Sequence, residues 1–214
     1  MMMNERPLIL VGAGGLAKEV AWAVARMNAA VPAYRLLGFC DDAPERQAGE
    51  WFGLPLLGPV ERAAERFAAE GVRPCFHCAV GDNARRKELA GRALKAGWEP
   101  ASVIDPSVLI APGVEIGAGS YVGVGCVLSA DVRIGAFALL NFQVTVGHDA
   151  VLGAYVQVCP GVRISGWCEI GEGALLGSNA VIVQKRRMGA WSVLGAGTVA
   201  FRDVPEKETV VRLS

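Results

Sequence analysis

The chain has 214 residues, of which 52% are hydrophobic and 20% charged, and its formal net charge at pH 7 is zero. A chain of this length can bury one large core or two small ones. The sequence has no basic excess, no basic amphipathic helix and no apolar run long enough to span a bilayer. These absences argue against nucleic acid and membranes as partners.

Glycine and cysteine are used in informative ways. The 27 glycines are too many for an ordinary helical protein and indicate repeated turns. The six cysteines show no disulfide-framework spacing, and the N-terminal stretch lacks a signal-peptide pattern. We therefore expect free thiols and a cytoplasmic location.

The first hundred residues alternate between strand-like and helix-like patterns. Short apolar runs ending in glycine or aspartate predict strands, and apolar residues at helical spacing predict helices. The expected order is a strand at 7–14, a helix at 15–28, a strand at 34–42, a helix at 59–71, a strand at 75–83 and a helix at 84–97. This alternation predicts a small parallel sheet with helices on its faces.

The pattern changes near Ile104, where an aliphatic residue begins to return at every sixth position. The series has no insertion or deletion: Ile104, Ile110, Ile116, Val122, Leu128, Ile134, Leu140, Val146, Leu152, Val158, Ile164, Ile170, Leu176, Ile182, Met188 and Leu194, with Ala200 as a weaker member. The residue after each is often glycine, such as Gly147, which we interpret as a turn residue.

A period of six fits neither an α-helix nor a hairpin meander. It is typical of a parallel β-helix, in which each hexapeptide forms one short strand and one turn. Three hexapeptides close one coil, so residues 18 apart should stack, and the aliphatic residues should form a continuous core. With strands about 4.8 Å apart, the prism should be about 25 Å tall.

His148 is one of two histidines, and the sequence places it just after the inward Val146, at a corner of a coil. A histidine there can act as a general base, and the following Asp149 can orient its ring. The residues 18 positions away, Ala130 and Gly166, are small and leave space beside the imidazole. The Gly166 N–H could then stabilise an oxyanion. The alternative is a structural histidine.

Nearly the whole chain resembles the bacterial sugar acetyltransferases. The resemblance rests on "LILVGAGGLAKEV", "GFCDD", "AVGDNARRKEL", "VIDPSVLIAPGVEIGAGSYVG" and "NFQVTVGHDAVLGAYVQVCPGVRISG", which occur in the family's order. It implies a Rossmann-like nucleotide-sugar-binding domain at 1–101 and a left-handed β-helix acetyltransferase domain at 102–214. The left-handed sense comes from the resemblance alone, because the general rule for parallel crossovers is right-handed.

The same resemblance implies roles for particular residues. His148 becomes the base, Asp149 its partner, and Asn141 a contact of the sugar acceptor. Acetyl-CoA would run along the prism edge between subunits of a homotrimer, where Gly166, Ser178 and Ala196 match contact positions. Gln157 could hydrogen-bond the acetyl group, and Lys185, from the charge cluster at 185–187, could meet the phosphates of the coenzyme. Gln157 stands where some relatives carry a second histidine. A turn role for Asn141 and a solvated corner for Lys185 are the alternatives.

The segment Gly12–Ala17 lies between a predicted strand and helix and resembles a dinucleotide fingerprint. By itself it would favour NAD, although the domain is short for a complete dinucleotide fold and no redox residue follows. The family instead implies that this pocket holds the nucleotide of the sugar substrate, with contacts from Gly14, Gly15, Asp41, Asp42 and Gly81. Glycines that only turn the chain remain the alternative.

A single C-x-x-C motif places Cys75, His77 and Cys78 on a predicted strand. Because no second cysteine pair follows at zinc-finger spacing, we expect core thiols and not a metal site. A β-helix carbonic anhydrase is excluded, because its metal would need three histidines and this chain has two.

From the resemblance we expect an acetyl-CoA-dependent N-acetyltransferase of a nucleotide-linked amino sugar for surface glycans. O-acetylation of sialic acid or a related sugar, and a non-catalytic sugar-binding module, are the rivals.

Overall fold

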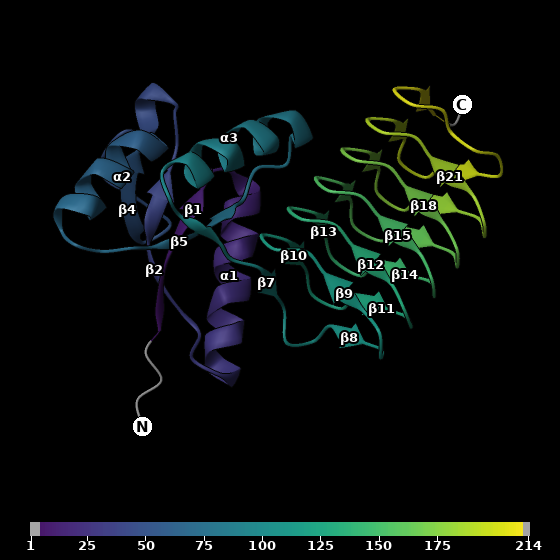
Figure 1. The fold of residues 1–214 in the computed structure, drawn as a ribbon, viewed down its shortest axis with the longest axis horizontal. Helices are drawn as coiled ribbons and strands as arrows, with labels where there is room; N and C mark the ends of the chain where they lie inside the picture. The colour runs from purple at the N-terminus through teal and green to yellow at the C-terminus, as the bar shows by residue number, and fades with distance from the viewer. Residues whose placement is uncertain (1–4, 212–214) are drawn as a thin grey trace. The chain divides into compact units, whose positions relative to one another are not determined.

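The computed structural model describes residues 5–211, which fall into two compact units that divide after Val103 (Figure 1). The first unit is an α/β domain and the second is a stack of short parallel strands, which are the two architectures expected from the sequence. No helix within residues 5–211 combines the length and apolar character needed to cross a bilayer.

The first unit is built on one sheet with the strand order β3-β4-β2-β1-β5-β6, parallel except for β3. Its elements are β1 (Arg6–Val11), α1 (Gly15–Ala30), β2 (Tyr34–Cys40), the 3₁₀ helix η1 (Pro44–Arg46), β3 (Glu50–Trp51), β4 (Leu54–Gly58), α2 (Val60–Ala69), β5 (Cys75–Cys78), α3 (Asn83–Lys95) and β6 (Glu99–Pro100).

The centre of this sheet is β1, which lies between β2 and β5. The chain moves outward from β1 to β2 and β4, then returns to the other side of β1 to form β5. Strand order therefore reverses between β1 and β5, and the crevice at the carboxyl ends of such strands is where doubly wound sheets bind ligands. Gly14 lies in the loop after β1, Gly15 begins α1, and Gly81 lies in the loop after β5, all at this end of the sheet.

The hairpin β3–β4 was not anticipated from the sequence. Its two central residues, Phe52 and Gly53, have φ of 49° and 71°, as a tight hairpin with two left-handed residues requires. The usual sequence signal for such a turn is Asn-Gly or Asp-Gly. Here phenylalanine stands in the first position, so the sequence lacks this signal.

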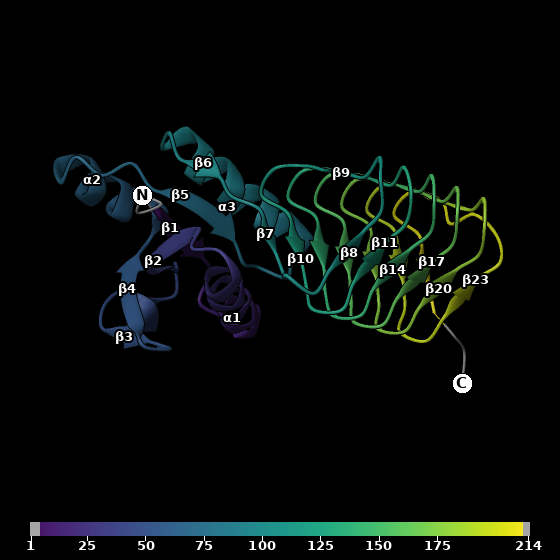
Figure 2. The same ribbon diagram turned by 90° about the horizontal axis from the view of Figure 1, so that it is seen from below.

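The second unit is a parallel β-helix with three faces (Figure 2). One face holds β7 (Val103–Ile104), β10 (Tyr121–Val122), β13 (Leu139–Leu140), β16 (Gln157–Val158), β19 (Leu175–Leu176), β22 (Val193–Leu194) and β24 (Thr209–Val210). The second holds β8 (Leu109–Ile110), β11 (Val127–Leu128), β14 (Thr145–Val146), β17 (Arg163–Ile164), β20 (Val181–Ile182) and β23 (Val199–Ala200). The third holds β9 (Glu115–Ile116), β12 (Arg133–Ile134), β15 (Val151–Leu152), β18 (Glu169–Ile170) and β21 (Arg187–Met188).

The predicted register of 18 residues is confirmed. Val127 pairs with Thr145, and Val146 pairs with Ile164, on neighbouring coils. From Val122 to Ala200 the sixth-position residues are all buried, and between Cys126 and Ala180 the residues two positions before them join the same core. Ile110 departs from the pattern, with 47% of its surface exposed, because it belongs to the first coil, which has no coil below it.

The glycines after the core residues stand at the first position of a turn, as the sequence suggested: the Gly147 carbonyl oxygen accepts the N–H of Ala150 at 3.4 Å. Gly147 has no positive φ; the left-handed residue of each corner comes two positions later and is often not glycine, as at Asp149 and Trp167. Glycine is needed because the next coil approaches closely. A Cβ on Gly135 would lie 2.5 Å from the nitrogen of Ala154, and one on Gly147 would lie 2.5 Å from that of Gly166.

His77 lies in the core of the first unit, on β5, with its Nδ1 2.9 Å from the carbonyl oxygen of Ala101. Burial, together with the nearby Arg86 guanidinium and against the hydrogen bond to Ala101, lowers the pKa of His77 to about 4. Burial also raises the pKa of the neighbouring Cys78 thiol to about 12. The "CFHC" residues are therefore neutral core groups at neutral pH.

We expect the His77 ring to titrate near pH 4, far below the ordinary 6.5. Unfolded His77 binds a proton near pH 6.5 and the folded form only near 4. The neutral His77 ring therefore makes its full contribution to the unfolding free energy above pH 6.5. This contribution, on the order of 3 kcal/mol, is lost as the pH falls from 6.5 toward 4. An NMR titration of the two histidine ring signals, assigned with His148→Ala, measures this. A His77 signal that titrates near 6.5 would contradict it.

Candidate active site

His148 lies at the corner that follows β14, and its side chain is 44% exposed. Its Nδ1 lies 2.8 Å from Oδ2 of Asp149, the next residue. Asp149 can make this contact because it takes the left-handed conformation, with φ of 58°, which aspartate tolerates better than most residues. The β-helix corner thus forms a base–carboxylate pair from two consecutive residues.

The His148 imidazole lies over Gly166, 18 residues further along the chain. A Cβ on Gly166 would come within 2.8 Å of Nε2 and 2.9 Å of Cε1. Other corners carry alanine at this position of the hexapeptide, as at Ala136, Ala154 and Ala190. Glycine at 166 therefore makes room for the imidazole itself, which fills the space that the sequence suggested for a thioester.

Two polar groups at this corner are available to a ligand. Within residues 5–211, neither Nε2 of His148 nor the N–H of Gly166 has a hydrogen-bond partner. The Gly166 nitrogen also has no side chain above it, because residue 147 is glycine. A proton acceptor and a backbone donor beside each other are what acyl transfer requires.

The structure brings some of the predicted site residues together. His148, Asp149, Gly166 and Lys185 share one corner, which follows the six-stranded face and is here called the His148 corner. The N–H of Lys185 donates to the Gly166 carbonyl oxygen at 3.1 Å. The ammonium of Lys185 lies 5.1 Å from the ring centre of Trp167, which the sequence analysis did not single out.

The other predicted residues of the β-helix do not join that corner within one chain. Asn141, Ser178 and Ala196 follow strands of the seven-stranded face, at a second corner, here called the Asn141 corner. Asn141 Oδ1 accepts the N–H of Phe142 at 2.7 Å. Gln157 lies on β16, which leads into this corner. Its Oε1 is buried and has no partner within the described residues.

A groove of about 500 Å³ begins beside the His–Asp pair. Asp149 and Trp167 line one part of it, and the ion pair of Arg187 with Glu169, at 3.2 Å, lines another. The remaining surface is mostly aliphatic or glycine backbone. A ligand in this groove would lie against the carboxylate that holds His148.

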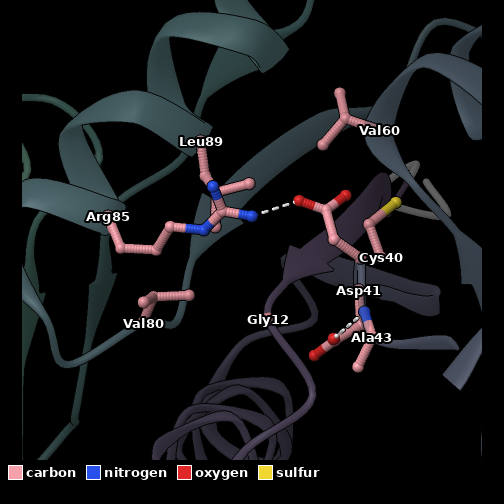
Figure 3. Close-up of a pocket in the computed structure, with 9 residues that line it drawn as sticks. Gly12, Cys40, Asp41, Ala43, Val60, Val80, Arg85 and Leu89 are labelled. Atoms are coloured by element: carbon pink, nitrogen blue, oxygen red, sulfur yellow. Dashed lines mark hydrogen bonds and ion pairs between the residues drawn. The ribbon is translucent and has the colours of Figure 1, made fainter. Parts of the chain in front are cut away.

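The first unit has its own cavity of about 230 Å³ at the carboxyl ends of its strands (Figure 3). Asp41 and Asp42, both predicted site residues, line it. Asp41 accepts the N–H groups of Ala13 at 2.8 Å and Ala43 at 2.9 Å, so its carboxylate joins the loop after β1 to the loop after β2.

Asp42 is held by two arginines of α3. Arg92 donates to both of its oxygens, at 2.6 and 3.0 Å, and Arg85 donates to Oδ2. The hydrogen bonds from Arg92 lower the pKa of Asp42, and they lower that of Glu61 to about 2. Arg85 lines the cavity and points across it (Figure 3). Sequence reasoning missed it because its pairing is long-range.

The predicted glycines of this unit occupy the switch-point end of the sheet. Gly14 caps α1 and Gly15 begins it, and a Cβ on either would meet no atom within 4 Å. Gly81 follows β5, and its carbonyl oxygen accepts from the buried Arg86 at 3.1 Å. Gly14, Gly15 and Gly81 do not line the 230 Å³ cavity. Within residues 5–211 no cluster of three metal-ligating side chains occurs.

Comparison with known proteins gives consistent matches. Residues 7–93 match the family described as the PglD N-terminal domain. No curated protein matches the chain. Among solved structures, the acetyltransferase domain of PglB from Neisseria gonorrhoeae, in complex with acetyl coenzyme A, is 30% identical, with a TM-score of 0.86. The match covers 97% of this chain and 96% of that chain.

Two further structures are similar over nearly their full length. A histidine-to-asparagine mutant of perosamine N-acetyltransferase from Caulobacter crescentus, in complex with CoA and GDP-perosamine, is 28% identical with a TM-score of 0.88, and 96% of this chain and 93% of that chain are covered. WeeI from Acinetobacter baumannii is 26% identical with a TM-score of 0.85 and 97% coverage of both chains.

The β-helix of hexapeptides and these similarities together define an acetyltransferase of the hexapeptide-repeat class. More particularly, the chain belongs to the bacterial sugar acetyltransferases, in which an N-terminal α/β domain precedes a left-handed β-helix. The family and fold predicted from the sequence are thereby confirmed.

The contact between His148 and Gly166 can be tested through stability alone. Gly166→Ala should cost about 1–3 kcal/mol of unfolding free energy, because the new Cβ overlaps the imidazole. In a His148→Ala background the same change should be neutral or slightly stabilising, since alanine lowers the entropy of the unfolded chain. Urea unfolding of the four proteins measures the difference. Equal costs in both backgrounds would contradict the contact.

Proposed function

We propose that this protein transfers the acetyl group of acetyl-CoA to the amino group of a nucleotide-linked amino sugar. The observation that carries the proposal is the His148–Asp149 pair, whose partly exposed imidazole lies over Gly166. Support comes from the similar structures, which hold acetyl coenzyme A in one case and CoA with GDP-perosamine in another.

His148 acts as the general base of this reaction. Its Nε2 removes a proton from the amine as the amine nitrogen forms a bond to the thioester carbon, and the Gly166 N–H stabilises the oxygen that becomes negative. When the carbon–sulfur bond breaks, the imidazolium returns the proton to the leaving sulfur. Asp149 keeps Nδ1 protonated and stabilises the positive charge that His148 carries in between.

The β-helix also offers groups that fit the coenzyme. Gln157 Oε1 is a buried acceptor without a donor among residues 5–211, and an amide N–H of the pantetheine arm would satisfy it. Ser178 and Ala196 lie at the same corner, the Asn141 corner. Lys185, at the His148 corner, offers a cation to the phosphates of the coenzyme. Because these groups lie at two corners of one chain, we propose a homotrimer in which the two corners of neighbouring subunits meet.

The α/β unit is proposed to hold the nucleotide. Its cavity has an aspartate pair and Arg85 beside it, and the start of α1 presents backbone N–H groups without any acidic residue in the first turn. A helix N-terminus of this kind favours a phosphate. The Arg85 guanidinium can release Asp42 and bind a diphosphate instead. A cytoplasmic location and a role in surface glycan synthesis stay predictions.

O-acetylation of sialic acid or a related free sugar is the second candidate, because His148 could deprotonate a hydroxyl in the same way. The cavity of the α/β unit favours the nucleotide-linked amine. Assaying UDP-, GDP- and dTDP-amino sugars alongside free sugars, with thiol release as the readout, separates the two. Absence of acetyl-CoA binding by calorimetry would favour a non-catalytic sugar-binding module instead.

His148→Ala should reduce kcat by about 10²- to 10⁴-fold, since it removes the proton acceptor. Asp149→Asn should cost less, because the base remains while its orientation weakens. Thiol release from acetyl-CoA, with the best acceptor of the screen, measures both. Light scattering should show the same oligomer as the wild type. Near-normal turnover by His148→Ala would refute the mechanism.

The proposed trimer predicts complementation between two inactive variants. His148→Ala damages one corner and Asn141→Ala the other, so a mixed trimer contains some sites in which both corners are intact. Co-expression in equal amounts should restore about a quarter of the wild-type activity, as random assembly of a cyclic trimer implies. Activity no higher than that of the separate variants, despite mixed trimers, would show that each site lies within one chain.

A further inference from the structure

Trp167 touches His148 in two ways that the proposed mechanism does not use. Its indole ring meets the imidazole edge-on, with ring centroids 4.4 Å apart and an angle of 86° between the planes. Its backbone N–H donates to the His148 carbonyl oxygen at 2.9 Å. It also directly follows Gly166, over which the imidazole lies. One residue thus contacts both the backbone and the side chain of the proposed base.

Backbone preference does not explain a tryptophan at this position. Trp167 has φ of 54°, in the left-handed region that favours glycine and asparagine over bulky residues. It is the single aromatic residue in its column at the His148 corner, where the neighbouring coils carry Gly113, Asp131, Asp149 and Lys185. Phe137, Tyr155 and Trp191 take the same conformation at the third corner, so the place of Trp167 beside His148, and not its φ, suggests a role in the site.

The ring of Trp167 is itself held in place. The ammonium of Lys185, one coil further on, lies 5.1 Å from its ring centre, within the range of a cation–π contact. Trp167 is 46% exposed, and its ring contacts both the Lys185 ammonium and the imidazole. Trp167 also lines the groove that begins at Asp149.

We propose that Trp167 is a positioning residue for His148. The hydrogen bond to Asp149 fixes Nδ1, and Gly166 leaves room beneath the ring. Neither contact prevents the imidazole from swinging toward the groove. The indole edge blocks that movement and keeps Nε2 directed at the acceptor. This inference rests on the proposed function of His148 and adds a residue that acts only through it.

A positioning role predicts a particular kinetic change. Trp167→Leu should lower kcat by about 10- to 100-fold, because a small misplacement of the base costs that much. The KM for acetyl-CoA should stay the same, since the indole supports the base and does not bind the coenzyme. Trp167→Phe keeps an aromatic edge beside the imidazole and should recover most of kcat.

Trp191 offers a matched control. It occupies the same position of its hexapeptide as Trp167, with φ of 58°, but follows the five-stranded face at the third corner. Trp191→Leu therefore removes an equivalent side chain from an equivalent backbone, away from His148. It should leave kcat at the wild-type value.

A second readout does not depend on activity. The chain has two histidines, so its histidine Hε1 NMR signals can be assigned with His148→Ala alone. The indole shifts the His148 signal through its ring current. Trp167→Leu should move that signal and leave His77 unchanged, and Trp191→Leu should move neither.

The outcomes separate this inference from the proposed function. Wild-type kcat in Trp167→Leu would overturn it. So would equal losses in Trp167→Leu and Trp191→Leu, or a raised KM for acetyl-CoA with unchanged kcat, which would make Trp167 a coenzyme contact. If the wild type transfers no acetyl group, or His148→Ala is fully active, the proposed function fails. The NMR comparison then still shows whether Trp167 sets the environment of His148.

Discussion

The close approach of successive coils is the constraint on which the β-helix and its site depend. Parallel pairing at 18 residues brings each corner so near the next that a Cβ on Gly135 or Gly147 would lie 2.5 Å from backbone nitrogen. Backbone that close cannot slide without losing its hydrogen bonds. A one-residue slip would also turn the buried aliphatic residues outward. The position of every corner residue is therefore set by the stack, whatever its side chain.

That rigidity explains how an exposed residue such as His148, the proposed base, can be held in one position. His148 has 44% of its side chain exposed and little packing of its own. The stack supplies its surroundings: Asp149 from the same corner, and Gly166 with Trp167 from the next coil. A catalytic group placed by rigid backbone loses little orientation when its ligand leaves. In the α/β unit the corresponding role falls to Asp41, which ties two strand-end loops together.

The sequence allowed the β-helix, its register and the stacking of His148 on Gly166 to be predicted, because a strict period of six fixes the partner of each residue. It could not show why glycine follows the core residues, since the reason is contact with a neighbouring coil and not local conformation. The Phe52-Gly53 hairpin lacks the usual turn residues. The pairing of Asp42 with Arg85 and Arg92, and the contact of Trp167 with His148, join residues from separate elements. Composition and spacing carry no signal for the arginine pairs, whereas the 18-residue register already places Trp167 one coil from Asp149 and thus beside His148.

The proposed trimer is consistent with the same geometry. A prism with three corners and a single chain direction presents the His148 corner and the Asn141 corner on different edges, so no bending of a rigid coil can bring them together. The buried Oε1 of Gln157 would remain costly in a lone chain, because an acceptor removed from water needs a donor. A ligand held where the two corners meet would satisfy that oxygen and lie beside the base of the neighbouring chain. In this arrangement, assembly is a condition of catalysis, since a lone chain holds only half of each site.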